Sequence, residues 1–191
     1  HPVAHSFPTR RSSDLDRATL NLLGNQEEML QRLFATGKPV IVVLMGGKPY
    51  AIPEIAEKAD VMLSTFYLGQ ENGNALSNVL FGKANPSGKL AISFPRYVGQ
   101  LPVYYSQKAT AFYKDYLEMP ARPLFPFGFG LSYTTFEMSD LQLENEKIDP
   151  GTNLRFSIKL KNTGKYEGAE VVQVYFSDPL ASVKKKKKLL V

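Results

Sequence analysis

Residues 40–45 (VIVVLM) form an uninterrupted apolar run that is rich in β-branched side chains. A run of this kind predicts a β-strand that is covered on both faces, as in a parallel sheet. A second strand is expected at residues 61–66, after a short helix over 53–58 that begins at a proline. Two strands joined through a helix predict a βαβ unit with a right-handed crossover.

Helices are expected on both sides of this unit. Asn25 stands three residues before Glu28, a spacing typical of helix capping, and apolar residues then recur at helical spacing over 26–35, up to Gly37. Another helix is expected over 72–81, with Gly82 as its stop. The alternation predicts an α/β fold, a three-layer α/β/α sandwich with a mainly parallel sheet.

From Phe136 the hydrophobic pattern changes to period two. Apolar residues alternate with polar ones over 154–161, residues 162–164 predict a turn, and the alternation resumes over 172–176. About three strands fit here, whereas an immunoglobulin-like sandwich needs roughly seven. The sequence therefore predicts a truncated all-β segment whose apolar face is exposed unless something covers it.

The net charge of +5 belongs to the ends of the chain. Between residues 16 and 183 there are 16 basic and 17 acidic residues, so no nucleic-acid partner is expected. The two histidines, His1 and His5, also lie near the start, and the chain has no cysteine. This excludes histidine- or cysteine-dependent catalysis, zinc sites and disulfides from the body. We expect no cofactor and no metal, and no apolar run is long enough to span a membrane.

Both ends are set apart from the fold. Residues 1–15 lack any apolar periodicity and are interpreted as a non-native scar, the alternative being a disordered native tail. Residues 184–191 hold five consecutive lysines and are either a solvated tail or a truncation scar.

Two glycine motifs do not indicate a ligand-binding loop. The pair Gly46-Gly47 lacks the spacing of a phosphate-binding loop and predicts a tight turn. Residues 127–130 (FGFG) predict flexible backbone beneath packed aromatic rings.

Residues 96–129 are rich in aromatic residues and proline. Tyrosines here could stack on a sugar ring, with the ring face against the sugar and the hydroxyl outward. The alternative is that they pack against the domain itself or against a missing neighbour. The candidates for substrate binding or for a domain interface are Tyr104, Tyr105 and Tyr113.

Several long motifs occur in order along residues 16–183. They include LGQENGNA (68–75), LFGKANPSGKL (80–90), SFPRYVGQLPVYY (93–105) and LFPFGFGLSYTTFE (124–137). These resemble the C-terminal α/β domain of glycoside hydrolase family 3. The following stretch, with KNTGKYEGAEVVQVYFSDPLASV, resembles the start of the fibronectin-III-like domain found in β-glucosidase and β-xylosidase members. The resemblance implies an incomplete α/β domain over 16–136 and the N-terminal part of a fibronectin-III-like domain over 137–183.

The resemblance implies a retaining hydrolase of terminal β-linked glucose or xylose, acting on oligosaccharides or glycosides. Such enzymes use two carboxyl groups about 5–5.5 Å apart. In the family, the nucleophilic aspartate belongs to an N-terminal barrel and the acid/base glutamate lies shortly before the pair matched by Asp16-Arg17. We expect neither in this chain, which is therefore expected to be inactive alone. The resemblance favours a periplasmic or secreted parent protein.

Each remaining carboxylate in the body has a structural interpretation, such as helix capping or a solvated helix face. Asp115 and Glu118 come nearest to a pair. The alternative function is a non-catalytic module that binds carbohydrate or docks onto the barrel. The carboxylates considered are Glu27, Glu28, Glu54, Glu57, Glu71, Asp115 and Glu118.

Overall fold

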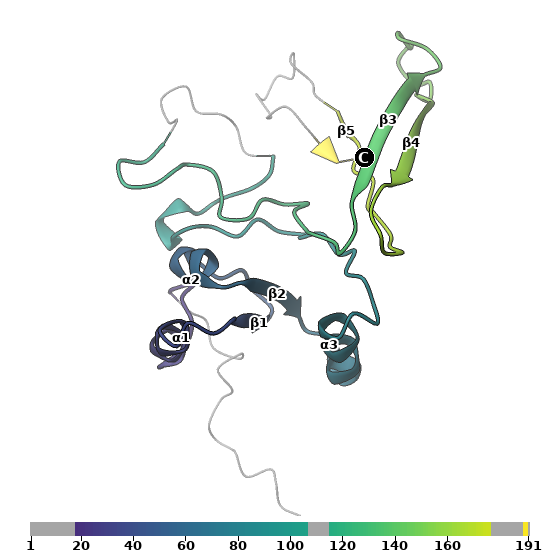
Figure 1. The fold of residues 1–191 in the computed structure, drawn as a ribbon. Coiled ribbons are helices and arrows are strands. Elements are labelled where there is room, and N and C mark those ends of the chain that lie inside the picture. Colours follow the sequence, from purple (N-terminus) through teal and green to yellow (C-terminus); the bar gives the residue numbers. More distant parts are fainter. Residues whose placement is uncertain (1–17, 107–114, 177–188, 191) are drawn as a thin grey trace, which may run out of the picture. The chain divides into compact units, whose positions relative to one another are not determined.

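The computed structural model describes residues 18–106, 115–176 and 189–190 (Figure 1). These residues form two compact units. Unit 1 consists of the described parts of residues 1–72, 90–129 and 174–191, and unit 2 consists of residues 73–89 and 130–173. Each unit consists of residues that lie near one another in space, so the units are not sequence domains. The domain boundary expected at residues 136–137 stays a prediction.

Unit 1 contains the predicted strand–helix–strand unit. Strand β1 (Ile41–Met45) pairs in parallel with β2 (Val61–Phe66), and α2 (Pro53–Lys58) connects them. Helix α1 (Gln26–Phe34) precedes β1, and Gly37, at φ +66°, ends the turn that follows it. The α/β class and the positions of these four elements are confirmed (Figure 1).

The core of unit 1 lies on one face of β1. Val42 and Leu44 are buried there against Leu30 from α1 and Ile55 from α2, with Ile52 and Phe94 completing the cluster. On the same strand Ile41 and Met45 are 51% and 55% exposed. The expectation that this strand is covered on both faces is wrong for the described residues, because neither helix packing in this core reaches the second face.

The start of α1 differs from the capping prediction. Asn25 makes no side-chain cap hydrogen bond. Glu27, in the first turn, instead accepts the backbone N–H of Leu22 at 3.2 Å. A carboxylate in this position also interacts favourably with the positive end of the helix dipole.

The aromatic segment of unit 1 is tied together by backbone pairing. Leu90 and Phe94 exchange backbone hydrogen bonds with residues 124–129, and Phe94 forms an antiparallel bridge with Phe125. Gly128 adopts φ +79° at this crossing, a conformation that favours glycine. The rings of Phe125 and Phe129 stack with centroids 5.2 Å apart, so the expected aromatic packing is present, while the expected flexibility of the backbone stays a prediction.

Unit 2 contains all but the first residue of α3 (Asn72–Leu80) and an antiparallel hairpin. Strands β3 (Phe136–Leu143) and β4 (Phe156–Asn162) pair with Met138 opposite Leu160, and the register shifts between Ser139 and Gln142. Several apolar side chains of this hairpin are exposed, as predicted: Met138, Leu143, Phe156 and Leu160 are 41–48% exposed, whereas Phe136 and Ile158 are partly buried.

The last predicted strand is shorter than its alternating pattern suggests. Only β5 (Tyr175–Phe176) is a strand, and it pairs with β6 (Leu189–Leu190) within unit 1. The apolar residues alternate over 172–174 as well, but these residues form no strand, because no strand among the described residues pairs with them. Among the residues that the structure describes, no helix is both long and apolar enough to cross a membrane.

Candidate functional site

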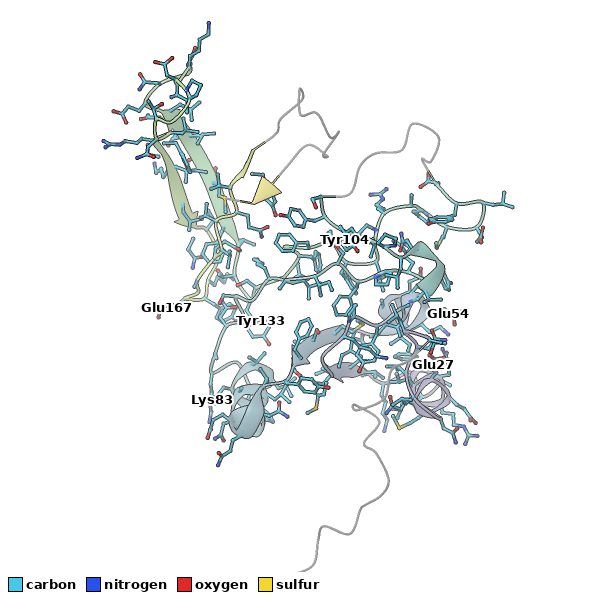
Figure 2. All side chains as sticks on the ribbon, turned by 180° about the vertical axis from the view of Figure 1, so that it is seen from behind. Glu27, Glu54, Lys83, Tyr104, Tyr133 and Glu167 are labelled. Carbon is cyan, nitrogen blue, oxygen red and sulfur yellow. The ribbon has the colours of Figure 1, made fainter. Side chains whose placement is uncertain are left out.

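The tyrosines predicted to bind substrate lie in two different environments. The Tyr105 ring stacks on Phe127, with centroids 4.3 Å apart and 21° between the planes, and meets Tyr175 edge-on at 6.4 Å. Tyr104 is 67% exposed (Figure 2). Tyr113 lies outside the described residues. Tyr104 is therefore the more exposed ring, whereas Tyr105, at 41% exposed, stacks on Phe127.

Buried polar side chains hold this segment in place. The amide of Gln100, only 6% exposed, accepts the Arg96 N–H at 2.8 Å and donates to the Ala121 carbonyl at 2.6 Å. The Ser93 hydroxyl accepts the Phe127 N–H at 3.1 Å. Because buried backbone groups need partners, these contacts stabilise an irregular segment that has little regular secondary structure.

The glycine pair after β1 is packed against tyrosines. A Cβ atom on Gly46 would collide with the Tyr50 hydroxyl, and one on Gly47 would lie 2.6 Å from the Tyr67 ring. The space beside both residues is therefore filled by side chains of the same unit. This agrees with a tight turn and leaves no phosphate cradle at these α carbons.

A hollow of about 150 Å³ lies on unit 1 between α1, α2 and Tyr97. The buried residues Ala51, Ile52 and Ile55 line this hollow. Polar side chains also line it, namely those of Asn21, Glu27, Gln31, Glu54 and Tyr97. Sequence reasoning missed this hollow, since its lining comes from three separated stretches and no local pattern connects them.

Three of the seven carboxylates weighed as catalytic replacements are engaged in local structure. Glu27 accepts the Leu22 N–H, Glu28 forms an exposed ion pair with Arg32 at 2.7 Å, and Asp115 accepts the Ala121 N–H at 2.9 Å. Each contact joins residues at most six positions apart. Such contacts stabilise turns and helix ends.

One carboxylate in unit 2 is distinctive. Glu170 lies 2.8 Å from the Lys89 ammonium, and both side chains are largely shielded from solvent. The hydrogen bond from Lys89, opposed in part by burial, lowers the pKa of Glu170 below its ordinary value. A general acid at neutral pH needs a raised pKa, so Glu170 fits a structural ion pair rather than a proton donor.

Asn85 joins three stretches of unit 2. Its Oδ1 accepts hydrogen bonds from the Ser132 hydroxyl at 2.9 Å and the Tyr133 N–H at 2.8 Å, and its Nδ2 donates to the Glu167 carbonyl at 2.9 Å. Nearby, Lys89 donates to the Gly130 carbonyl at 2.8 Å. The motif at 80–90 thus supplies two polar side chains that organise the unit, whereas in the sequence this stretch stood out only for its resemblance to the family.

Within the described ranges, no group of three or more histidine, cysteine, aspartate or glutamate side chains is placed to hold a metal ion. The chemistry available in these ranges is that of carboxylates, lysines, tyrosines, amides and backbone groups.

Comparison with protein families matches residues 3–133 to the glycosyl hydrolase family 3 C-terminal domain. The matched range begins inside residues 1–15, and the interpretation of that stretch as a scar stays a prediction.

Two curated relatives match nearly the whole chain. The periplasmic beta-glucosidase of Salmonella typhimurium is 43% identical and the beta-xylosidase of Formosa agariphila 47% identical, over 91% and 92% of this chain. The matches cover 24% and 25% of these relatives. The chain therefore spans about a quarter of their length.

Solved structures agree with this assignment. A beta-glucosidase from Listeria innocua in complex with isofagomine has a TM-score of 0.85 at 35% identity, over 91% of this chain and 26% of that one. A β-glucosidase from Erythrobacter marinus has a TM-score of 0.87 at 41% identity, over 92% and 23%. The chain belongs to glycosyl hydrolase family 3 and carries the C-terminal domain of that family.

Proposed function

We propose that this chain is part of a retaining β-glycosidase that releases terminal β-linked glucose or xylose from oligosaccharides or glycosides. The observation that carries the proposal is the similarity, at 43–47% identity over more than nine-tenths of the chain, to proteins named beta-glucosidase and beta-xylosidase. The absence of histidine and cysteine from residues 16–183 is compatible with a reaction that needs only carboxylates.

The chain itself lacks the two catalytic carboxyl groups in this proposal. The nucleophilic aspartate belongs to an N-terminal barrel, and the acid/base glutamate lies shortly before Asp16. Two observations support the proposal that the catalytic carboxyl groups lie outside this chain. Local contacts engage Glu27, Glu28 and Asp115, and the pKa of Glu170 is lowered. The substrate meets the complete enzyme, and this part supplies one wall or support of the site.

The test is an activity assay on the purified chain 1–191 with aryl β-glucosides and aryl β-xylosides. We expect hydrolysis no faster than in buffer, because neither member of the carboxylate pair is present. Turnover clearly above background that copurifies with the chain would contradict the proposed absence of catalytic groups.

A second candidate function is a non-catalytic module that uses the aromatic segment to bind glycans or to dock onto the barrel. The exposed ring of Tyr104 favours it, whereas the stacking of Tyr105 on Phe127 leaves that ring less available. Titration with xylo- and cello-oligosaccharides, followed by tyrosine fluorescence, distinguishes glycan binding from docking onto the barrel. Glycan binding predicts a saturable signal that Tyr104→Ala removes, and docking alone predicts none.

A further inference from the structure

The hairpin of unit 2 carries all the large apolar side chains of its two strands on one side. In the antiparallel register Met138 lies opposite Leu160, and Leu143 lies opposite Phe156. Partners in such pairs point to the same side of a sheet. We call this side the apolar face of the hairpin. Its members are Phe136, Met138, Leu141, Leu143, Phe156, Ile158 and Leu160.

A β-bulge in β3 keeps the apolar face continuous. Simple alternation from Phe136 would send Leu141 and Leu143 to the opposite side of the strand. The register instead shifts within residues 139–142, where Asp140 adopts φ +54°, a left-handed conformation that aspartate tolerates better than most residues. The extra residue returns both leucines to the side of the other apolar residues.

The apolar face is poorly covered, and the charges of the hairpin lie on its other side. Five of the seven apolar side chains are 41–63% exposed, and Leu141 is the most exposed of them. On the other side Glu137 lies opposite Lys161. Lys159 Nζ lies there too, 3.7 Å from Asp140 Oδ2. A partner could therefore cover the apolar face without burying a charge.

The two outer edges of the hairpin are less suited to a partner than the apolar face. The bulge interrupts the edge of β3, and Lys159 and Lys161 lie on β4. Bulges and lysines are features that protect sheet edges from pairing with further strands. Pairing of β3 with β3, or of β4 with β4, from two copies would also bring like charges together.

The composition of the apolar face favours a second copy of this chain as its partner. None of its seven members is polar or charged. Homodimer interfaces are more apolar than the rest of a protein surface, whereas interfaces between transient partners are about as polar as that surface. Two such sheet faces pack about 10 Å apart, with strand directions within about 30°. The charged sides of both hairpins then stay in water.

We propose that two copies of this chain form a dimer by packing the apolar faces of their β3–β4 hairpins together around a two-fold axis. A two-fold contact uses the same surface on both copies and so closes at two. The proposal does not depend on the proposed function.

The exposed area predicts a weak dimer. The five exposed side chains offer on the order of 400 Å² of apolar surface per copy, if a large side chain has about 150–250 Å². A stable interface buries about 800 Å² per partner. We therefore expect half-dimerisation at a chain concentration on the order of 100 μM.

The experiment is sedimentation velocity of the chain 1–191 over a concentration series from about 1 μM to about 1 mM, chosen to bracket that value. The mean mass should rise from one chain toward two and level off there. Leu141→Lys should weaken dimerisation at least about tenfold, because it would bury an unpaired charge. Met138→Gln, a milder change on the same face, should weaken it about threefold. The amide NMR spectrum of each variant at low concentration shows whether it retains the fold.

The matched control is Gln142→Lys. It adds the same charge at the neighbouring residue, which points to the charged side of the hairpin opposite Ser157. Dimerisation of this variant should equal that of the natural chain.

Three results would overturn the proposal. A chain that stays monomeric throughout the series would show that a second copy does not cover the apolar face. A mass that continues to rise beyond two copies would indicate pairing through the strand edges. Equal weakening by Gln142→Lys and Leu141→Lys would show that the contact does not use the apolar face.

Discussion

The two units of this chain are held together in different ways. Unit 1 buries six apolar residues in one cluster, from Leu30 on α1 to Phe94, which bridges to Phe125 in the aromatic segment. In unit 2, among the residues that the structure describes, only Thr134 is buried, and its hydroxyl donates to Asn162 Oδ1 at 2.8 Å. Unit 2 is organised instead by Asn85, Asn162 and the Lys89–Glu170 ion pair. Within one chain, unit 1 is therefore stabilised by an apolar core and unit 2 by a network of polar side chains.

The largest effect is expected from the core of unit 1. Phe94 is 1% exposed, and its ring meets those of Phe66 and Phe125 edge-on at 6.4 and 6.3 Å. Phe94→Ala removes these contacts and leaves a cavity, so it should cost about 3–5 kcal/mol. Hydrogen exchange of the β1 and β2 amides measures this loss. The exposed Leu117→Ala serves as control and should change stability by less than about 0.5 kcal/mol. Equal effects of the two substitutions would contradict the assignment of the core.

In unit 2 the largest effect is expected at Asn85. Asn85→Ala removes three hydrogen bonds, one of them part-buried and two exposed to water, which should cost about 1–2 kcal/mol. Exchange of the Tyr133 amide and of the β3 and β4 amides reports the loss. Asn85→Asp keeps the acceptor for Ser132 and Tyr133 and should cost less. If Asn85→Ala leaves the stability of unit 2 unchanged, the polar network does not stabilise this unit.

A smaller effect that depends on pH is expected from Glu170. Its pKa is lowered in the folded chain by the hydrogen bond from Lys89. The stabilisation is therefore present above the unfolded pKa of a glutamate, about 4.3, and is lost as pH falls through the lower folded pKa. At pH 7, Glu170→Gln should destabilise unit 2 by about 1 kcal/mol, between the values for exposed and buried pairs.

The pH dependence is checked by denaturant unfolding of both forms between neutral and acidic pH. The difference between the natural chain and Glu170→Gln should shrink on acidification. A difference that is constant across this range would show that the carboxylate contributes no charge-dependent stability.

The smallest effect is expected on the surface of unit 1. Glu28 and Arg32 form an i,i+4 ion pair at 2.7 Å with both side chains mostly exposed. Glu28→Gln should cost only about 0.3–0.5 kcal/mol, and high salt should remove most of that difference. A loss above about 1 kcal/mol, measured by thermal unfolding at low salt, would indicate that exposed charges matter more than the comparison of units allows.

The elements of unit 1 were predictable because their signals are local. The apolar runs of β1 and β2 and the proline at the start of α2 each lie within a few residues. The coverage of β1 was not predictable in the same way, since an apolar run is compatible with one covered face or two. The hydrogen bond from the Leu22 N–H to Glu27 also depends on where the Leu22 backbone lies, which no spacing rule specifies.

The candidate sites were less predictable than the fold. Asn85 was not singled out by the sequence analysis, because its contacts with Ser132, Tyr133 and Glu167 span up to 82 positions. The hollow likewise combines Asn21, Glu54 and Tyr97, which become neighbours only through the packing of the unit. For the aromatic segment, the sequence indicated the ring-rich stretch but could not distinguish the exposed Tyr104 from the stacked Tyr105.

We propose that this chain, which carries the family 3 C-terminal domain, is part of a glycosidase whose catalytic carboxylates lie upstream of Asp16. Sequencing the genomic DNA upstream of the Asp16 codon tests it most directly. We predict a reading frame that encodes a glutamate shortly before Asp16 and, further upstream, a barrel domain with the nucleophilic aspartate. A frame that runs through residues 1–15 into a domain of another class would contradict the claim.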